Sequence, residues 1–118
     1  PPFVQRAGVV AVKDGEASVQ QTVARLHSSR DLLVSALAAL PGLEVAPPPG
    51  AMYLFFRIAG RSDDSVALAK QLVAEAGLGI APGAAFGPEG EGYLRWCFAA
   101  SEALLQQGAA RLKEFLRK

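Results

Sequence analysis

The longest regular pattern in this 118-residue sequence is an apolar stripe that runs through residues 16–40. Its positions recur at alternating steps of four and three residues, which is the spacing of one face of an α-helix. The stripe consists of Val19, Val23, Leu26, Arg30, Leu33, Leu37 and Leu40, and only Arg30 is polar. A helix of about 25 residues would be roughly 40 Å long, because each residue adds about 1.5 Å. So long a helix in so short a chain is expected to run along, or bridge to, something larger.

Residues 3–12 precede this helix and are apolar nearly all round, which predicts a short helix that is buried on more than one side. Pro2 is compatible with the first turn of this helix, and Gly15 permits a break before the long helix. Pro41 and Gly42 are expected to end the long helix, because proline cannot continue the hydrogen-bond ladder and glycine tolerates a positive φ.

Four short segments are predicted to form β-strands, and the second and fourth of them have the strongest strand composition. They are residues 43–45, 52–58, 78–81 and 93–98. Side chains alternate along a strand, so the last segment should divide its residues between two faces of the sheet. One face would carry Tyr93, Arg95 and Cys97, and the other Leu94, Trp96 and Phe98.

Two further helices are predicted from their caps and apolar faces. Ser62 or Asp63 would cap a third helix that ends at Gly77, and Ser101 would cap the last one. The apolar face of the third helix would be Val66, Ala69, Leu72, Val73 and Ala76, and that of the last helix Leu104, Leu105, Ala109, Leu112, Phe115 and Leu116. The order of elements favours one domain over residues 1–118, with an α/β fold of the α+β two-layer sandwich type. In this fold a small, mostly antiparallel sheet has helices packed on one face.

Composition excludes several classes of function. Twelve Lys and Arg residues against eleven Asp and Glu give a net charge of +1, which argues against a nucleic-acid binder. A single cysteine excludes an intrachain disulfide framework and a cysteine-rich zinc site, and it fits a cytoplasmic protein. No apolar run approaches the roughly 20 residues that span a bilayer, so no membrane partner is expected. The chain opens on Pro1 and Pro2 without a methionine, which raises the question of a missing N-terminal part.

Few side chains are candidates for chemistry. The sequence has neither a GxxxxGK phosphate loop nor a GxGxxG motif after a strand, and its one histidine leaves no pair for a metal. His27 and Lys70 are expected to be solvated on helix surfaces. Cys97 is expected to be a packed, inert thiol, because no nearby base would activate it.

Arg95 is the exception, because it lies in the middle of a strand with no acidic residue between Tyr93 and Ser101 to pair with it. A guanidinium is always charged and needs a partner where its surroundings are dry. Two interpretations stay open. Arg95 could lie at the rim of the sheet and reach solvent or a distant acid, or its partner could be a ligand carboxylate held by two parallel hydrogen bonds.

A loop rich in glycine and proline, residues 82–92, directly precedes the strand of Arg95. It could be an ordinary flexible surface loop. Alternatively, its small residues could let the backbone approach a ligand, with Phe86 as an apolar wall.

Three segments carry a resemblance to a known family. They are Pro-Gly-Ala-Met-Tyr-Leu-Phe at residues 49–55, Gly-Ile-Ala-Pro-Gly-Ala-Ala-Phe-Gly at residues 79–87 and Gly-Tyr-Leu-Arg-Trp-Cys-Phe-Ala at residues 92–99. With the closing helix they resemble the C-terminal small domain of the class I/II, fold-type I aminotransferases. These enzymes depend on pyridoxal 5'-phosphate and transfer an amino group between an amino acid and a 2-oxo acid. The resemblance covers essentially the whole chain, and it is specific to the superfamily but weak about the substrate.

The resemblance implies substrate-binding roles for three residues. Arg95 matches the arginine that binds the α-carboxylate, Tyr53 matches an aromatic position near the substrate pocket, and Phe86 matches the loop at the pocket entrance. In the family this domain moves toward the large domain when the carboxylate binds, which closes the site against water. The resemblance assigns no catalytic, cofactor-binding or metal-binding residue to this chain.

The family's cofactor-binding residues come from the large domain. Lys13, Lys70, Lys113 and Lys118 do not fit the motif of the lysine that forms the Schiff base. The chain is therefore expected to be one domain of a longer enzyme, inactive alone and without bound pyridoxal phosphate. Its implied partners are the large domain of the same enzyme, the amino acid or 2-oxo acid substrate, and a second subunit of a homodimer.

Two other hypotheses stay open. The chain could be a stand-alone amino-acid-binding or regulatory α/β module, although such a module has no use for a stripe that outruns its own sheet. It could also be a structural or interaction domain whose apolar first segment is a dimer contact.

Overall fold

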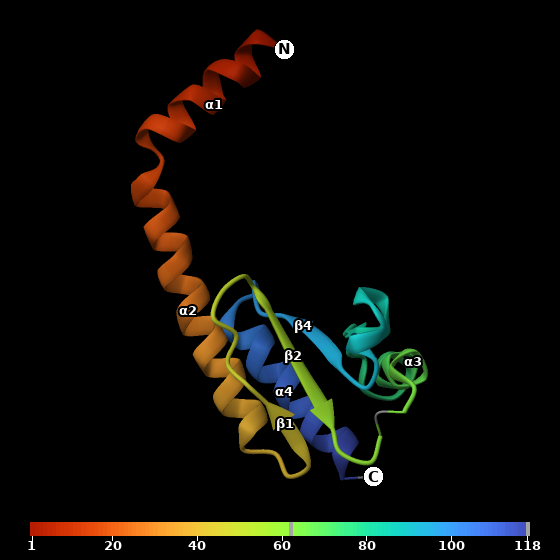
Figure 1. Ribbon diagram of the computed structural model, residues 1–118. Helices are drawn as coiled ribbons and strands as arrows, with labels where there is room; N and C mark the ends of the chain where they lie inside the picture. Colours follow the sequence, from red (N-terminus) through yellow and green to blue (C-terminus); the bar gives the residue numbers. More distant parts are fainter. Residues whose placement is uncertain (62, 118) are drawn as a thin grey trace.

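A computed structural model describes residues 1–61 and 63–117 of the chain, and its elements follow one another in the predicted order (Figure 1). The helices are α1 (Pro2–Asp14), α2 (Glu16–Ala38), α3 (Ser65–Ala76) and α4 (Glu102–Leu116). The strands are β1 (Leu43–Val45), β2 (Tyr53–Ile58), β3 (Ala81–Pro82) and β4 (Leu94–Cys97). Two short 3₁₀ turns, η1 (Gly83–Phe86) and η2 (Pro88–Gly90), lie between β3 and β4.

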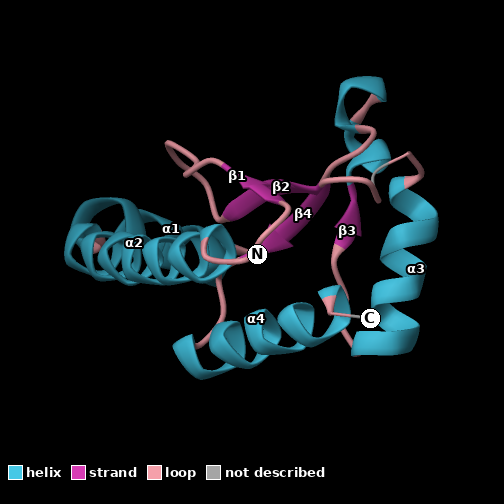
Figure 2. Cartoon of the chain, turned by 90° about the horizontal axis from the view of Figure 1, so that it is seen from below, coloured by secondary structure: helices cyan, strands magenta, loops and turns pink. Residues whose placement is uncertain are grey.

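The strands form one antiparallel sheet in the order β1-β2-β4-β3. Seen from below in Figure 2, α2 and α4 lie on one side of this sheet and α3 flanks β3. The apolar core fills the space between them, with fully buried side chains from each layer such as Leu37, Phe56 and Leu112. The predicted two-layer sandwich is therefore confirmed.

Burial divides α2 into two parts. Leu33 and Leu37 are fully buried against the sandwich, and Leu40 just beyond the helix is also buried. Toward the N-terminus, Val19 and Val23 are 53% and 40% exposed. The helix outruns the sheet, as its length predicts.

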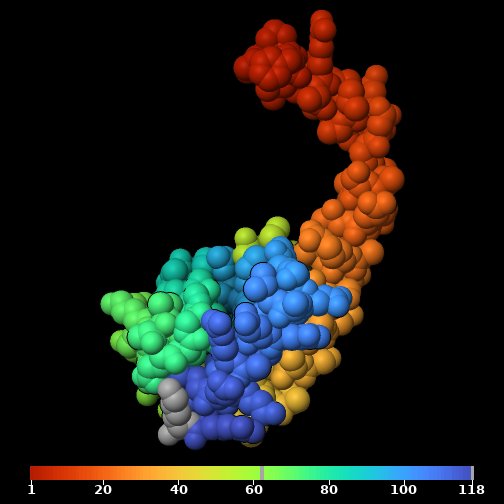
Figure 3. Space-filling model, turned by 180° about the vertical axis from the view of Figure 1, so that it is seen from behind, coloured from red at the N-terminus to blue at the C-terminus, as the bar shows by residue number. Residues whose placement is uncertain are grey.

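Helix α1 forms as predicted, but the prediction that it is buried is wrong for this chain. None of its residues is buried, and Phe3 and Val12 are 73% and 88% exposed. We call residues 2–20 the arm, because they lead away from the sandwich (Figures 1 and 3). The arm raises the radius of gyration to 17.1 Å, against about 13.5 Å for a compact chain of this length.

Helix α3 begins one residue later than predicted. Asp64, rather than Asp63, is the N-cap, and its carboxylate accepts a hydrogen bond of 2.8 Å from the N–H of Ala67. Ser62, the other predicted cap, lies outside the described residues. Gly77 ends the helix in the left-handed conformation with φ of 63°, as expected for a glycine at this position.

The buried face of α3 also differs from its prediction. Ala69 and Leu72 are buried as predicted, and Leu68 is buried with them, whereas Val66 and Val73 are exposed, because α3 packs beside the edge strand β3 and not flat on the sheet. The edge strand itself is shorter than predicted. Its pairing with β4 involves Ala81 and Pro82, and residues 78–80 form no strand.

Alternation along β2 and β4 divides their side chains between two faces of the sheet, as predicted for β4. Leu54, Phe56 and Leu94 point toward the helices and are buried. The opposite face is not covered by the helices, and we call it the bare face (Figure 2). Its residues on these two strands and beside β4 are Tyr53, Phe55, Arg57, Tyr93, Arg95 and Cys97.

Candidate functional site

The three residues singled out from the sequence meet on the bare face. Arg95 projects from β4, and its Cζ lies 3.7 Å from the centre of the Phe86 ring and 4.2 Å from the centre of the Tyr53 ring. Tyr53 comes from the start of β2, and Phe86 ends the η1 turn. Three separate segments therefore converge on one half-buried guanidinium.

The charge of Arg95 has no partner within the described residues, because its guanidinium makes neither a hydrogen bond nor an ion pair with residues 1–61 or 63–117. The ring contacts attract the cation, but they leave its charge unpaired. Arg57, the second arginine of the bare face, differs in this respect. Its Nη1 lies 3.7 Å from Glu44 and its Cζ lies 5.4 Å from the Tyr93 ring centre, although its buried Nε has no hydrogen-bond partner among the described residues.

Phe55 belongs to the same cluster and was missed at the level of sequence. It pairs with Arg95 across β2 and β4, and its ring meets the Phe86 ring edge-on at 5.7 Å between centroids. It also lies 6.4 Å from the Tyr93 ring. The available signal was the two-residue spacing from Tyr53 to Phe55, which places both rings on one face. The register of the two strands, which sequence alone did not supply, brings Phe55 opposite Arg95.

The loop over residues 82–92 is closed on itself and carries Phe86. A Cβ atom on Gly83 would overlap the carbonyl oxygen of Gly90, and one on Gly90 would overlap the carbonyl oxygen of Gly83. The N–H of Gly83 donates a 2.7 Å hydrogen bond to the carbonyl of Tyr93. These contacts explain why glycine is needed at both places, and they favour the interpretation of this segment as a built turn over that of an ordinary flexible loop.

Ser65 and Glu91 attach this turn to the N-terminus of α3. The buried hydroxyl of Ser65 accepts a 3.2 Å hydrogen bond from the N–H of Ala84. The carboxylate of Glu91 accepts hydrogen bonds of 2.9 Å from the N–H of Gly92 and 2.7 Å from the N–H of Ser65. These bonds, together with one from the Ser65 hydroxyl, lower the pKa of Glu91 below its usual value, because they favour the charged form.

The other residues considered from the sequence lie away from this cluster or have a different environment. His27 and Lys70 are exposed on α2 and α3, as predicted. Cys97 is exposed on the bare face, so the prediction of a packed thiol is wrong. The strand ends at this residue, and the helices cover only the opposite side of the sheet. Among the described residues, no group of His, Cys, Asp and Glu is arranged to hold a metal ion.

The described lysines lie on helix surfaces. Lys13, Lys70 and Lys113 are exposed on α1, α3 and α4, three different helices. Lys118 lies outside the described residues.

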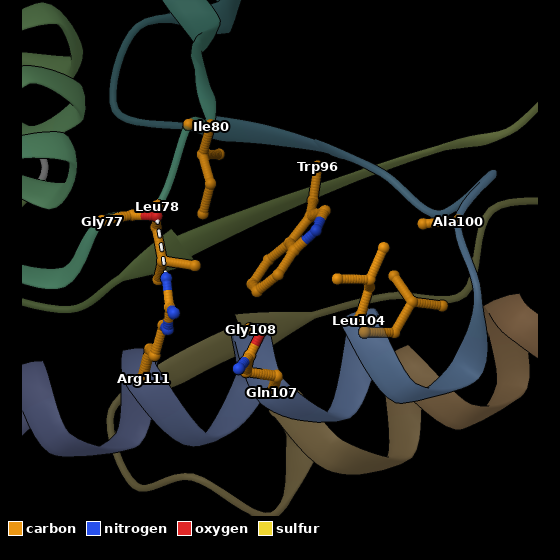
Figure 4. Close-up of a pocket in the computed structure, with 11 residues that line it drawn as sticks. Gly77, Leu78, Ile80, Trp96, Ala100, Leu104, Gln107, Gly108 and Arg111 are labelled. Atoms are coloured by element: carbon orange, nitrogen blue, oxygen red, sulfur yellow. Dashed lines mark hydrogen bonds between the residues drawn. The ribbon is translucent and has the colours of Figure 1, made fainter.

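A pocket of about 340 Å³ opens on the helix side of the sheet and is separate from the Arg95 cluster. Figure 4 shows the Trp96 ring pointing toward α4, above Gly108, while Arg111 reaches the carbonyl of Gly77. Trp96 and Arg95 are neighbours on β4, so their side chains project to opposite faces. The pocket therefore contributes nothing to the site on the bare face.

The chain is similar to known proteins over nearly its whole length. The sequence model of the family described as Aminotransferase class I and II matches residues 1–112. The aspartate aminotransferase of Pyrococcus horikoshii is 34% identical over 116 residues, which make up 97% of this chain and 30% of that protein. The aromatic-amino-acid aminotransferase 2 of Thermococcus litoralis is 30% identical over 118 residues, with 98% and 30% covered.

Solved structures agree with the sequence relatives. The aromatic aminotransferase from Pyrococcus horikoshii OT3 superposes with a TM-score of 0.89 at 31% identity, over 98% of this chain and 31% of that one. The chain thus spans about 30% of the length of the relatives that it matches. No helix of the described residues is both long enough and apolar enough to cross a membrane.

Proposed function

Because this chain belongs to the family of class I and II aminotransferases, we propose that it is the C-terminal small domain of a longer, pyridoxal-phosphate-dependent enzyme. The enzyme transfers an amino group between an amino acid and a 2-oxo acid. In this proposal the chain binds the α-carboxylate of the substrate through Arg95 and closes the active site.

The observation that carries the proposal is the unpaired guanidinium of Arg95 on the bare face. Its two ring contacts, at 3.7 Å and 4.2 Å, restrict the side chain but do not pair its charge with an anion. A carboxylate matches the planar fork of a guanidinium with two parallel N–H···O bonds. Because the side chain is already held by Phe86 and Tyr53, less conformational entropy is lost when the carboxylate binds.

The arm supplies a separate reason to expect a longer protein. Its exposed apolar side chains include Phe3, Val9, Val10, Val12 and Val19. Large apolar side chains that are exposed in such a number on one short segment are normally covered by a partner. The relatives are about three times as long as this chain. The large domain of the same enzyme is therefore the proposed partner that covers the arm. We further propose that the full-length protein is a cytoplasmic homodimer.

Pyridoxal phosphate supplies the electron sink for amino-group transfer when it is bound in the full-length enzyme. The described lysines of this chain are solvated on three helices, so in this proposal the large domain provides the Schiff-base lysine and holds the cofactor. This chain binds and orients the substrate carboxylate and, on closure, helps to exclude water. Alone it is inactive.

The test is kinetic and uses the full-length protein. Replacing Arg95→Ala removes two charge-assisted hydrogen bonds of about 1.5–3 kcal/mol each, so kcat/KM should fall by about 10²–10⁴-fold. Arg95→Lys should recover only part of this loss, because an ammonium group cannot reproduce the two-pronged contact. An amine substrate without the carboxylate should react equally poorly with the wild type and with Arg95→Ala.

The matched control is Arg57→Ala, since Arg57 lies on the same face but is already paired with Glu44. This variant should keep KM within about threefold of the wild type, as expected for a residue outside the site. Wild-type kinetics for both Arg95 variants would contradict the proposal.

The alternative of a stand-alone amino-acid-binding module makes a different prediction for the isolated 118-residue chain. Calorimetric titration with free amino acids would then give micromolar binding. The small-domain proposal requires the large domain for tight binding and predicts no measurable heat.

A further inference from the structure

We propose that Ser65 and Glu91 are positioning residues that hold Phe86 over the guanidinium of Arg95. The inference rests on the proposed function, in which that guanidinium binds the substrate carboxylate. Neither residue acts on Arg95 directly. They act through the backbone of the η1 turn, which begins at Gly83 and ends at Phe86.

Phe86 needs such support because the sheet holds it on one side only. Its ring is 44% exposed, and its described ring contacts are Arg95 and the edge of Phe55. A surface aromatic side chain on a short turn would otherwise move with that turn. Its position over the cation therefore depends on what fixes the backbone just before it.

Ser65 fixes that backbone two residues before Phe86. Its side chain is 1% exposed, and its oxygen accepts the N–H of Ala84 at 3.2 Å. A half-buried N–H that loses such a partner is costly, because water cannot replace the bond freely. Ser65 lies in the first turn of α3, so the turn is anchored to a regular helix.

Glu91 fixes the other end of the same loop. One carboxylate oxygen accepts the N–H of Ser65 at 2.7 Å and the N–H of Gly92 at 2.9 Å. The loop is thus attached to α3 at both ends, and the close approach of Gly83 to Gly90 joins the two ends to each other. Bonds to an ionised acceptor are stronger than neutral ones, which suits a clamp exposed to solvent.

The test uses NMR on the 118-residue chain labelled with ¹⁵N. Aromatic rings shift the signal of a nearby proton, so the Nε–H signal of Arg95 reports the placement of Phe86 independently of any ligand. Ser65→Ala and Glu91→Ala should both move this signal toward the position of a solvent-exposed arginine, in the direction given by Phe86→Leu. Exchange of the Ala84 amide proton should become about tenfold faster in Ser65→Ala, because its bond is lost.

Matched controls separate this effect from general destabilisation. Ser29→Ala removes the other buried serine hydroxyl of the described residues, and Glu89→Ala removes a carboxylate from the same loop. Both should leave the Arg95 signal in place. Glu91→Ala removes the acceptor of both backbone bonds from an exposed side chain, so it keeps the test informative if Ser65→Ala does not fold.

Kinetics of the full-length protein distinguish the positioning role of Ser65 and Glu91 from the binding of the substrate carboxylate by Arg95. Ser65→Ala should raise KM by about tenfold and leave kcat within about twofold, as expected when a binding group is displaced. An unchanged Arg95 signal in both variants would overturn the positioning role, whatever Arg95→Ala does. A shifted signal with an unchanged KM would uphold the positioning role and contradict carboxylate binding by Arg95.

Discussion

The arm and the sandwich are built from similar apolar residues but use them in opposite ways. In the sandwich, Phe56, Phe98 and Phe115 are at most 2% exposed, whereas Phe3 in the arm is 73% exposed. Helix α1 is on average more apolar than helix α4, yet only α4 has a buried face. The comparison shows that an apolar helix signals the need for a partner and does not say whether that partner lies in the same chain.

The largest expected difference comes from removing a phenylalanine ring in each region. In the 118-residue chain, Phe115→Ala should lower the free energy of unfolding by about 3–5 kcal/mol, because it leaves a cavity in the core. Phe3→Ala should change it by no more than about 0.5 kcal/mol, because the ring is exposed already. Urea denaturation followed by circular dichroism measures both.

The same pair of variants sharpens the comparison in the full-length protein. If the large domain covers the arm, Phe3→Ala becomes destabilising there, on the order of 1 kcal/mol or more. Equal effects of Phe3→Ala in the short and full-length proteins would contradict the proposed cover of the arm.

A medium effect is expected at two helical glycines. A Cβ atom on Gly108 of α4 would lie 2.6 Å from the Trp96 ring, so Gly108→Ala should cost about 1–3 kcal/mol through overpacking. Gly8 of α1 has no heavy atom within 4 Å of such a Cβ, and Gly8→Ala should favour the helix by about 0.5–1 kcal/mol. Helicity and thermal unfolding would be measured for both, and a destabilising Gly8→Ala would show that the arm packs against the chain itself.

The smallest effect concerns acid. The hydrogen bonds to Glu91 lower its pKa in the folded state, so the unfolded chain binds its proton first as the pH falls. The stabilisation by Glu91 is complete above the pKa of an unfolded glutamate, about 4.3. It is lost as the pH falls through the lower folded value.

Urea midpoints of the wild type and Glu91→Gln at pH 7 and pH 3 check this expectation. The difference between the urea midpoints of the wild type and Glu91→Gln should be smaller at pH 3 than at pH 7. The difference between the wild type and Glu89→Gln should not decrease in this way, because Glu89 does not attach the loop to α3. An equal difference in urea midpoint between the wild type and Glu91→Gln at both pH values would contradict a contribution from the charged carboxylate.

Much of the fold could be predicted from sequence because its signals are local. Glycine at position 77 and serine at position 101 mark helix ends through their own backbone and side-chain chemistry. Only part of the apolar face of α3 could be predicted in the same way, since Val66 and Leu68 are equally plausible inward residues until the place of α3 beside β3 is known. Cys97 was expected to be packed but is exposed, because the sequence did not show that the helices cover only the opposite face of the sheet.

Some residues of the candidate site could likewise be predicted from sequence, and others could not. Arg95 was found from sequence because an arginine without a nearby acidic residue is unusual in an apolar strand, whereas Tyr53 was found only through the family resemblance. Ser65 and Glu91 were not found, since they are 26 residues apart and neither lies in an unusual sequence context. Only the folded chain brings them together.

By itself the sequence determined the order of the elements and the face on which Arg95 lies, because helix and strand periodicity depend on neighbouring residues. The tertiary structure alone decided that Phe55 lies opposite Arg95, that the η1 turn carries Phe86 onto the guanidinium, and that the arm stays uncovered. These features depend on contacts between distant segments, whose register and packing are set by the whole core and not by any single stretch of chain.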